Sequence, residues 1–210
     1  MAQRSAVRAL LFDLGGVVLR IDVERALRAW APFSSLPLPQ LVERAVVDEA
    51  FRQHERGEID AATYFAHLRE QLALDASDEQ IGAGWNAIVV EPFATSVSLI
   101  RDVRRRLPCY AFTNTGAYHY ARWGQAFPEV VGLFERIFMS FELGMRKPET
   151  AAFNSVAQSI DCPPDQILFF DDSAENVEGA RLAGLQAVQI TEPDDIARAL
   201  NAAGITPPLS

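Results

Sequence analysis

The stretch LLFDLGGVVLRID, residues 10–22, decides the fold that we expect for this chain. A short apolar run leads into a carboxylate, Asp13, and the chain then turns on Gly15 and Gly16. Such a run is typical of a buried strand in a parallel sheet, where ligands bind beyond the carboxyl ends of the strands. Two interpretations of Asp13 are open at this point: it is a catalytic group, or it only begins a turn.

Four more apolar runs predict the rest of the sheet. They are rich in Val, Ile, Leu and Phe and do not alternate with polar residues, as expected for strands that are covered on both faces. Helical patterns lie between the later runs, for example over residues 96–107. Strands that alternate with helices predict a doubly wound, Rossmann-like α/β core. The five runs span residues 7–13, 108–114, 136–140, 166–171 and 185–190.

The interval from about Asp22 to Glu91 differs, because it contains helical patterns and no convincing strand. Asp22 and Ser77 stand where N-caps of helices are expected. We therefore expect a small all-helical cap over residues 21–91, inserted into an α/β core of residues 1–20 and 92–210. The four predicted helices span residues 21–30, 38–57, 60–74 and 77–88.

The composition is that of an ordinary globular chain. Its 210 residues are 49% apolar and 22% charged, which suits one core with a small insert. The net charge of −9 argues against nucleic acid or an anionic membrane as a partner, but not against a small anion in one pocket. Cys109 and Cys162 form no metal-binding pattern, and no protein partner is evident. Neither a signal peptide nor a membrane span is predicted, so we expect a cytoplasmic protein with a frayed tail over residues 204–210.

Six polar residues lie at or near the carboxyl ends of the predicted strands and are expected to converge on one rim of the sheet. Their carboxylates, hydroxyl, amide and ammonium groups suit an Mg²⁺ ion and a phosphoryl group. A carboxylate there can act as a nucleophile and form an aspartyl-phosphate. Each residue alone has a structural alternative as a turn former or helix cap, so the joint occurrence favours a catalytic site. The residues are Asp13, Thr113, Asn114, Lys147, Asp171 and Asp172.

These residues lie in four motifs that resemble those of the haloacid dehalogenase (HAD) superfamily, in its phosphatase branch with a helical cap. Other stretches, among them IDVERALRAW at residues 21–30, are similar to bacterial α-D-glucose-1-phosphate phosphatases of that superfamily. The resemblance implies an Mg²⁺-dependent phosphatase for a small phosphate monoester, such as the sugar phosphate glucose 1-phosphate. The motifs are FDLGG at 12–16, FTNT at 112–115, GMRKPE at 144–149 and FFDDSAEN at 169–176.

The resemblance also implies which residues hold the metal. Asp13, the nucleophile, is an Mg²⁺ ligand together with the backbone carbonyl of Gly15 and the carboxylate of Asp172. Asp171 supports the ion through water, and Asn176 braces the site from one helical turn further on.

The remaining motif residues are implied to bind the phosphoryl group. Thr113 and the backbone amide of Asn114 hold its oxygens. Lys147 pairs with both Asp13 and the phosphate, and so keeps two anions compatible at short distance.

Gly15 departs from the pattern of the family, in which most phosphatases have a second Asp at this position. That acid protonates the leaving alcohol, and such help is worth about 10²–10⁴-fold in rate. Glycine has no proton to offer. We therefore expect either another proton donor or a leaving group that needs little help, as in an anomeric sugar phosphate.

Four residues are candidates for the missing donor or for substrate contacts. His119 follows the second strand, Asp22 lies at the entry to the cap, and His54 and Glu55 lie near the end of the second cap helix. Each has a structural alternative: a structural histidine for His119, an N-cap for Asp22, and a solvated helix end for the pair.

Two other functions stay open. The 2-haloacid dehalogenases also lack the second Asp, but the chain has no arginine in the setting that those enzymes use for halide, and the paired acids Asp171 and Asp172 favour a metal. A catalytically weak protein that binds a phosphometabolite or a partner is the second alternative, and Gly15 permits it. The presence of Asp13 and Lys147 argues against it.

Overall fold

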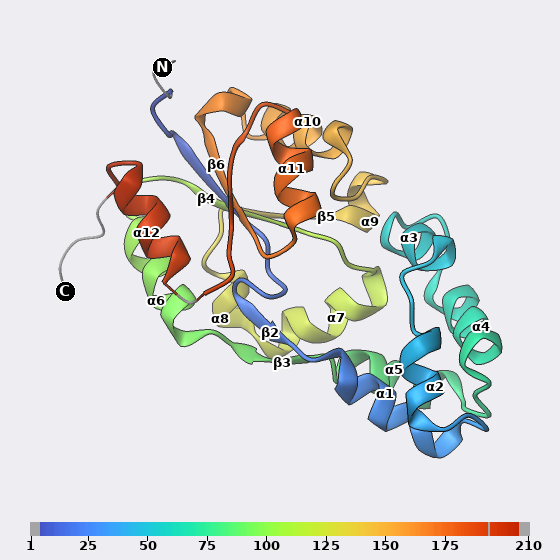
Figure 1. Ribbon diagram of the computed structural model, residues 1–210. Coiled ribbons are helices and arrows are strands. Elements are labelled where there is room, and N and C mark those ends of the chain that lie inside the picture. Colours follow the sequence, from blue (N-terminus) through green and yellow to red (C-terminus); the bar gives the residue numbers. More distant parts are fainter. Residues whose placement is uncertain (1–4, 193, 206–210) are drawn as a thin grey trace.

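The computed structural model describes residues 5–192 and 194–205 and contains the predicted sheet. Its strands are β1 (Ala9–Phe12), β4 (Cys109–Thr113), β5 (Arg136–Met139), β6 (Ile167–Asp171) and β7 (Gln186–Gln189). They run parallel in the order β5-β4-β1-β6-β7, so the first strand lies at the centre (Figure 1). Each of the five predicted runs supplies one strand, and the α/β prediction is confirmed.

Helices cover both faces of this sheet. Side chains of β1 point alternately to the two faces, so that Leu10 and Phe12 join one hydrophobic core while Ala9 and Leu11 join the other. Helices α6 and α12 pack on the first core, and α10 and α11 on the second. The helices are α6 (Ala94–Val103), α7 (Ala117–Ala126), α8 (Pro128–Val131), α9 (Ser140–Leu143), α10 (Thr150–Ser159), α11 (Ala174–Leu182) and α12 (Asp195–Ala202), with a 3₁₀ turn η2 (Pro164–Gln166).

A separate group of helices lies to one side of the sheet, at the lower right of Figure 1. These helices bury a core of their own, in which Trp30, Phe65 and Leu72 are among the buried side chains. They are α1 (Val23–Trp30), α2 (Leu38–Arg44), α3 (Glu49–Glu55), α4 (Ala61–Leu72) and α5 (Asp78–Asn86), with a 3₁₀ turn η1 (Ala31–Phe33). Asp22 caps α1 and Ser77 forms a capping box at the start of α5, as the sequence predicts.

The prediction of one continuous helix over residues 38–57 is wrong, because the chain breaks it into α2 and α3. Ala45 leaves the helical conformation, and the β-branched Val46 and Val47 follow in the break. Asp48 then starts α3 by accepting a hydrogen bond from the backbone N–H of Phe51. The carboxylate of Asp48 also lies 2.6 Å from the imidazole of His67 on α4, a contact that fixes where the second helix begins.

The prediction that residues 22–91 contain no strand is also wrong at one end. Strands β2 (Leu19–Ile21) and β3 (Val89–Pro92) pair as an antiparallel ribbon that joins the helical group to the sheet (Figure 1). Strands this short carry little periodicity, and only their pairing makes them visible. We propose that this ribbon links a core of residues 1–20 and 92–210 to a cap of residues 21–91.

The described part of the chain contains no helix long and apolar enough to cross a membrane. Cys109 and Cys162 are buried free thiols. Of the tail that we expected to fray, residues 206–210 lie outside the described residues, as do residues 1–4 and 193.

Candidate active site

The carboxyl ends of the central strands bring acidic side chains together. Asp13 follows β1, and Asp171 and Asp172 stand at the end of neighbouring β6. Carboxylate oxygens of these three residues lie within 4.8 Å of one another. The topology causes this convergence, because neighbouring parallel strands end at the same edge of the sheet.

Lys147 lies within this cluster of three carboxylates and is almost completely buried. Its Nζ lies 2.8 Å from Oδ1 of Asp13 and 2.6 Å from Oδ2 of Asp171. Burial alone lowers the pKa of Lys147, but the charges of Asp13 and Asp171 outweigh burial and raise the pKa above its usual value. The amine is therefore a permanent cation between two acids.

Asn114 holds Lys147 in place through the backbone. Its side-chain Nδ2 donates to the carbonyl of Lys147 at 3.0 Å, and its Oδ1 accepts from the backbone N–H of Lys147 at 2.9 Å. No pattern in the sequence predicts this pairing, because Asn114 and Lys147 lie in loops that follow different strands. Both polar atoms of the Asn114 side chain are thus engaged with the backbone of Lys147.

Asp171 is the most constrained of the acids. Besides Lys147, it accepts hydrogen bonds from the backbone N–H of Ser173 at 2.9 Å and from Nδ2 of Asn176 at 3.0 and 3.1 Å. Asn176, in the first turn of α11, thus contacts Asp171 directly. Asp172 is more exposed and packs over Gly16, whose φ is +74°. A Cβ on Gly16 would lie 2.2 Å from Oδ2 of Asp172, so only glycine fits there.

This group of residues fits a divalent cation such as Mg²⁺. All three side chains offer carboxylate oxygens, the ligands that Mg²⁺ prefers. Burial raises the pKa of Asp13 to about 7, and although Lys147 opposes that effect, the charge of Asp171 adds to it. Deprotonated Asp13 is therefore costly beside the other acids, and a bound divalent cation offsets that cost.

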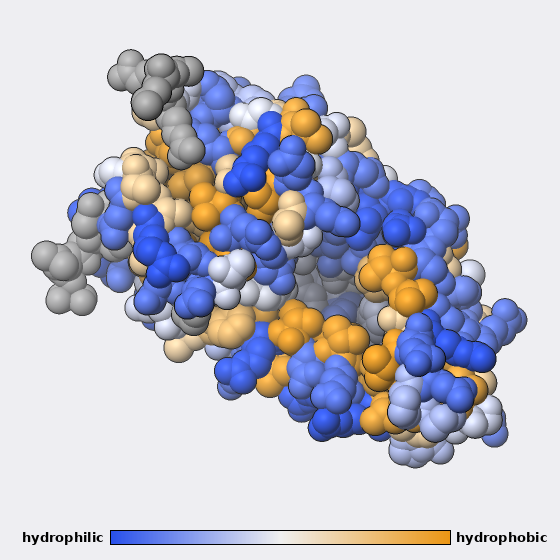
Figure 2. All heavy atoms as spheres, viewed as in Figure 1, coloured by the Kyte–Doolittle hydropathy of each residue, from blue (hydrophilic) through white to orange (hydrophobic). Residues whose placement is uncertain are grey.

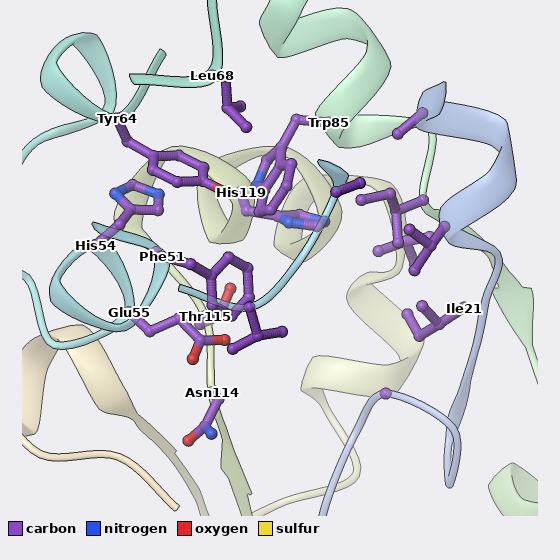
Figure 3. Close-up of a pocket in the computed structure, with 18 of the residues that line it drawn as sticks. Ile21, Phe51, His54, Glu55, Tyr64, Leu68, Trp85, Asn114, Thr115 and His119 are labelled. Carbon is purple, nitrogen blue, oxygen red and sulfur yellow. The ribbon is translucent and has the colours of Figure 1, made fainter. Parts of the chain in front are cut away.

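A pocket of about 290 Å³ opens from this site toward the helical group. Leu14, Gly15, Thr113 and Asn114 line it at the sheet, and α1, α3, α4 and α5 supply most of its other walls. Figure 3 shows Asn114 at the opposite end of the pocket from the side chains of α4. The pocket therefore places a ligand between the charged groups of the sheet and the helices.

Comparison with known protein families identifies the family to which the chain belongs. The sequence profile of the haloacid dehalogenase-like hydrolases matches residues 7–184, a span that includes all three clustered carboxylates and Lys147. The chain belongs to this hydrolase family. The resemblance seen in the four motifs is thereby confirmed.

Related proteins agree with this assignment. A HAD-family enzyme of Bacteroides thetaiotaomicron, solved with magnesium and inorganic phosphate, aligns with a TM-score of 0.80 and 29% identity over 92% of this chain and 99% of its own. A sesquiterpene phosphatase, astK of Aspergillus oryzae, is 27% identical over 88% of this chain and 90% of its own. Drimenol cyclase drtB of Aspergillus calidoustus is 28% identical over 92% of this chain, which spans only 36% of the cyclase.

In this HAD-like hydrolase, His54 and Glu55 are buried, so their interpretation as a solvated helix end is wrong. Glu55 lines the pocket and accepts a hydrogen bond at 2.8 Å from Nε of Arg146, the neighbour of Lys147. His54 packs so closely on Gly116 that a Cβ there would lie 2.3 Å from its Nε2. Helical periodicity could not reveal this burial, because it depends on how α3 meets α9 and the loop after β4.

His119 also lines the pocket of the hydrolase, with its ring against Trp85. Burial lowers the pKa of His119 to about 4, and the neighbouring His54 adds to this effect. Its imidazole is therefore neutral at pH 7. A neutral imidazole accepts hydrogen bonds and is a poor general acid at that pH.

Asp22 lies outside the pocket lining and acts on helix α1. Its Oδ1 accepts a hydrogen bond from the backbone N–H of Glu24 at 3.1 Å. Of the two interpretations of Asp22, the structure favours the N-cap.

Replacing Asp22 with alanine is therefore expected to lower the free energy of unfolding by about 1 kcal/mol. The rate of the catalysed reaction should change by less than about two-fold, since the side chain does not reach the pocket. Chemical denaturation and steady-state kinetics of the same preparation measure both quantities. A hundred-fold loss of kcat without a loss of stability would instead make Asp22 a proton donor.

Proposed function

We propose that this hydrolase is an Mg²⁺-dependent phosphatase that cleaves a small phosphate monoester through an aspartyl-phosphate on Asp13. The observation that carries the proposal is the contact of Lys147 with Asp13 and Asp171 beside a third carboxylate. A buried nucleophile held next to a fixed cation suits attack on an anionic phosphorus centre. The relative solved with magnesium and phosphate, and the relative named as a phosphatase, support the same reaction.

Asp13, Asp172 and the backbone carbonyl of Gly15 would hold the Mg²⁺ ion in this proposal, with Asp171 behind them. The bound ion supplies positive charge against the oxygens of the phosphoryl group. Asp171 and Asn176 act as positioning residues, since their hydrogen bonds join each other and Lys147 rather than the pocket.

Lys147, Thr113 and the backbone N–H of Asn114 would hold the phosphoryl group. A carboxylate oxygen of Asp13 attacks phosphorus, the bond from phosphorus to the leaving oxygen breaks, and that oxygen departs with the electron pair. Water then attacks the phosphorus of the aspartyl-phosphate, and the bond to Asp13 breaks to return the carboxylate and release inorganic phosphate. Lys147 balances negative charge throughout both steps.

The leaving oxygen finds no acid at Gly15, and neutral His119 does not replace it at pH 7. We therefore expect the rate to depend steeply on how basic the leaving oxygen is. Phenyl phosphate should have a kcat at least about 100-fold above that of ethyl phosphate, the lower bound of the help that an acid gives. Steady-state phosphate release from the two esters measures this. Equal rates would mean that another residue donates the proton.

A phosphate-release screen with Mg²⁺ tests the function, and it includes glucose 1-phosphate as the sugar phosphate predicted from the sequence. We expect turnover that chelation by EDTA abolishes, and a denaturation midpoint that rises with Mg²⁺ concentration through linkage. Turnover no higher than in the Asp13→Asn variant would favour a protein that only binds phosphometabolites or a partner. Release of chloride from 2-chloropropionate, independent of Mg²⁺, would favour the dehalogenase alternative.

A further inference from the structure

The pocket beyond the phosphoryl end has almost no charge. Among its described lining residues Glu55 carries the only carboxylate, and no lysine or arginine lines it. Glu55 is already paired with Arg146. Burial lowers the pKa of both His54 and His119, which leaves their rings neutral at pH 7. This part of the pocket therefore offers no unpaired charged side chain to a second charged group of a substrate.

Several polar groups of the pocket are also already engaged. Nε1 of Trp30 donates to the carbonyl of Ile81 at 3.0 Å, and Nε2 of Gln71 donates to Asp48 at 3.3 Å. Nε2 of His54, Nε2 of His119 and Nε1 of Trp85 have no hydrogen-bond partner among the described residues. Polar side chains such as Tyr64 and Thr115 also line the pocket, but most of its lining residues are apolar, which suits a hexose with its several hydroxyl groups poorly.

The helices fill the remaining wall with apolar side chains. Leu68 and Leu72 of α4 line it. Figure 3 shows Leu68 with Phe51 and Trp85 around the cavity. A hydroxyl group buried against such a wall without a hydrogen-bond partner loses its hydration, whereas a methylene group gains free energy there. The wall therefore favours a hydrocarbon over a sugar.

The mouth of the pocket is apolar as well. Val46 and Val47, in the break between α2 and α3, are 58% and 55% exposed, and Ile21 and Val23 are exposed across the opening. Figure 2 shows apolar residues on both sides of the hollow between the helical group and the sheet. Exposed apolar side chains around one opening are typical of a ligand site.

We infer that the substrate of this phosphatase carries an apolar leaving group, an alcohol or phenol of about ten carbons, in the pocket under α3 and α4. The inference rests on the proposed function and names its substrate class. The size follows from the cavity of about 290 Å³, roughly twice the apolar volume that holds one benzene molecule.

A series of 4-alkylphenyl phosphates tests the inference, since the alkyl chain adds apolar area while the basicity of the leaving oxygen stays nearly constant. From phenyl to 4-butylphenyl phosphate, kcat/KM should rise roughly three-fold per methylene, and it should level off with longer chains. Glucose 1-phosphate should have a lower kcat/KM than 4-butylphenyl phosphate. This series needs no variant and is measured on the full chain.

Substitutions at two matched valines test where the alkyl chain of the substrate binds. Val47 lines the mouth, whereas Val42 on α2 is similarly exposed and lies outside the pocket lining. Val47→Asn should lower kcat/KM for 4-butylphenyl phosphate about five-fold more than for phenyl phosphate, because it replaces an apolar contact with a polar one. Val42→Asn should leave the ratio of the two substrates unchanged.

The outcomes separate the inference from the proposed function. If phosphate is released but kcat/KM does not depend on chain length, or is highest for glucose 1-phosphate, the inference is wrong and the phosphatase stands. If no ester is hydrolysed faster by the wild type than by Asp13→Asn, the proposed function fails and the inference fails with it.

Discussion

Asp13→Asn is expected to lower kcat for phosphate release by at least about 10⁴-fold, because it removes the nucleophile and nearly preserves the shape of the side chain. The same change should make the metal-free protein more stable at pH 8. Burial raises the pKa of Asp13 from 3.8 to about 7, so the buried carboxylate disfavours folding once it loses its proton. The neutral amide avoids that cost.

The raised pKa of Asp13 also predicts how the stability of the metal-free protein changes with pH. A group whose pKa is raised in the native state binds its proton more tightly there than in the unfolded chain. The stability of the metal-free wild type should therefore fall as pH rises from about 4 through about 7, by about 2–4 kcal/mol. Urea denaturation in EDTA at pH 5 and pH 8 measures the fall. A fall of equal size in Asp13→Asn would assign it to another group.

Lys147→Met is expected to abolish detectable turnover, with a loss of at least about 10³-fold, and to destabilise the fold by about 3–5 kcal/mol at pH 8. Methionine keeps most of the volume of the side chain but leaves Asp13 and Asp171 without their shared cation. The loss of stability should be smaller at pH 5, since protonation of the carboxylates relieves their repulsion.

A double-mutant cycle separates the charge effect from a packing defect. Adding Asp13→Asn to Lys147→Met removes one of the two carboxylates left without a cation, so Asp13→Asn should stabilise the Lys147→Met variant by about 1–3 kcal/mol more than it stabilises the wild type. An equal gain in the two backgrounds would mean that Lys147 stabilises the fold through packing alone. Lys147 is the only lysine of the chain, so isotope labelling of lysine yields a single ammonium signal that reports this contact directly.

The sheet can be predicted from the sequence because its three central strands, β4, β1 and β6, are apolar runs that lead into polar residues. Charged side chains are costly in a strand that is buried on both faces, so β1, Ala9–Phe12, is apolar throughout. The clustering of the carboxylates can be predicted for the same reason, since Asp13 and Asp171 lie at the ends of neighbouring strands. Lys147 was expected to pair with Asp13 and the phosphate. Its contact with Asp171 was not predicted.

The helical group was less predictable, because its geometry depends on contacts between distant segments. Residues 38–57 have an apolar pattern that suits one helix, and only the partners of Asp48 show where α3 begins. Burial of Glu55 depends on Arg146, which is far away in the sequence. The apolar pocket forms from several such helices, so no single stretch of sequence predicts it.

Trapping of the covalent intermediate tests the central proposal most directly. The wild type is mixed with phenyl phosphate and Mg²⁺, quenched in acid, digested with trypsin and analysed by mass spectrometry. Cleavage after Arg8 and Arg20 gives a peptide in which Asp13 is the only acidic side chain. We expect this peptide to gain one phosphoryl group, and the corresponding peptide of Asp13→Asn to gain none. Phosphate release with the phosphoryl group on a histidine, or on a peptide without Asp13, would contradict the account.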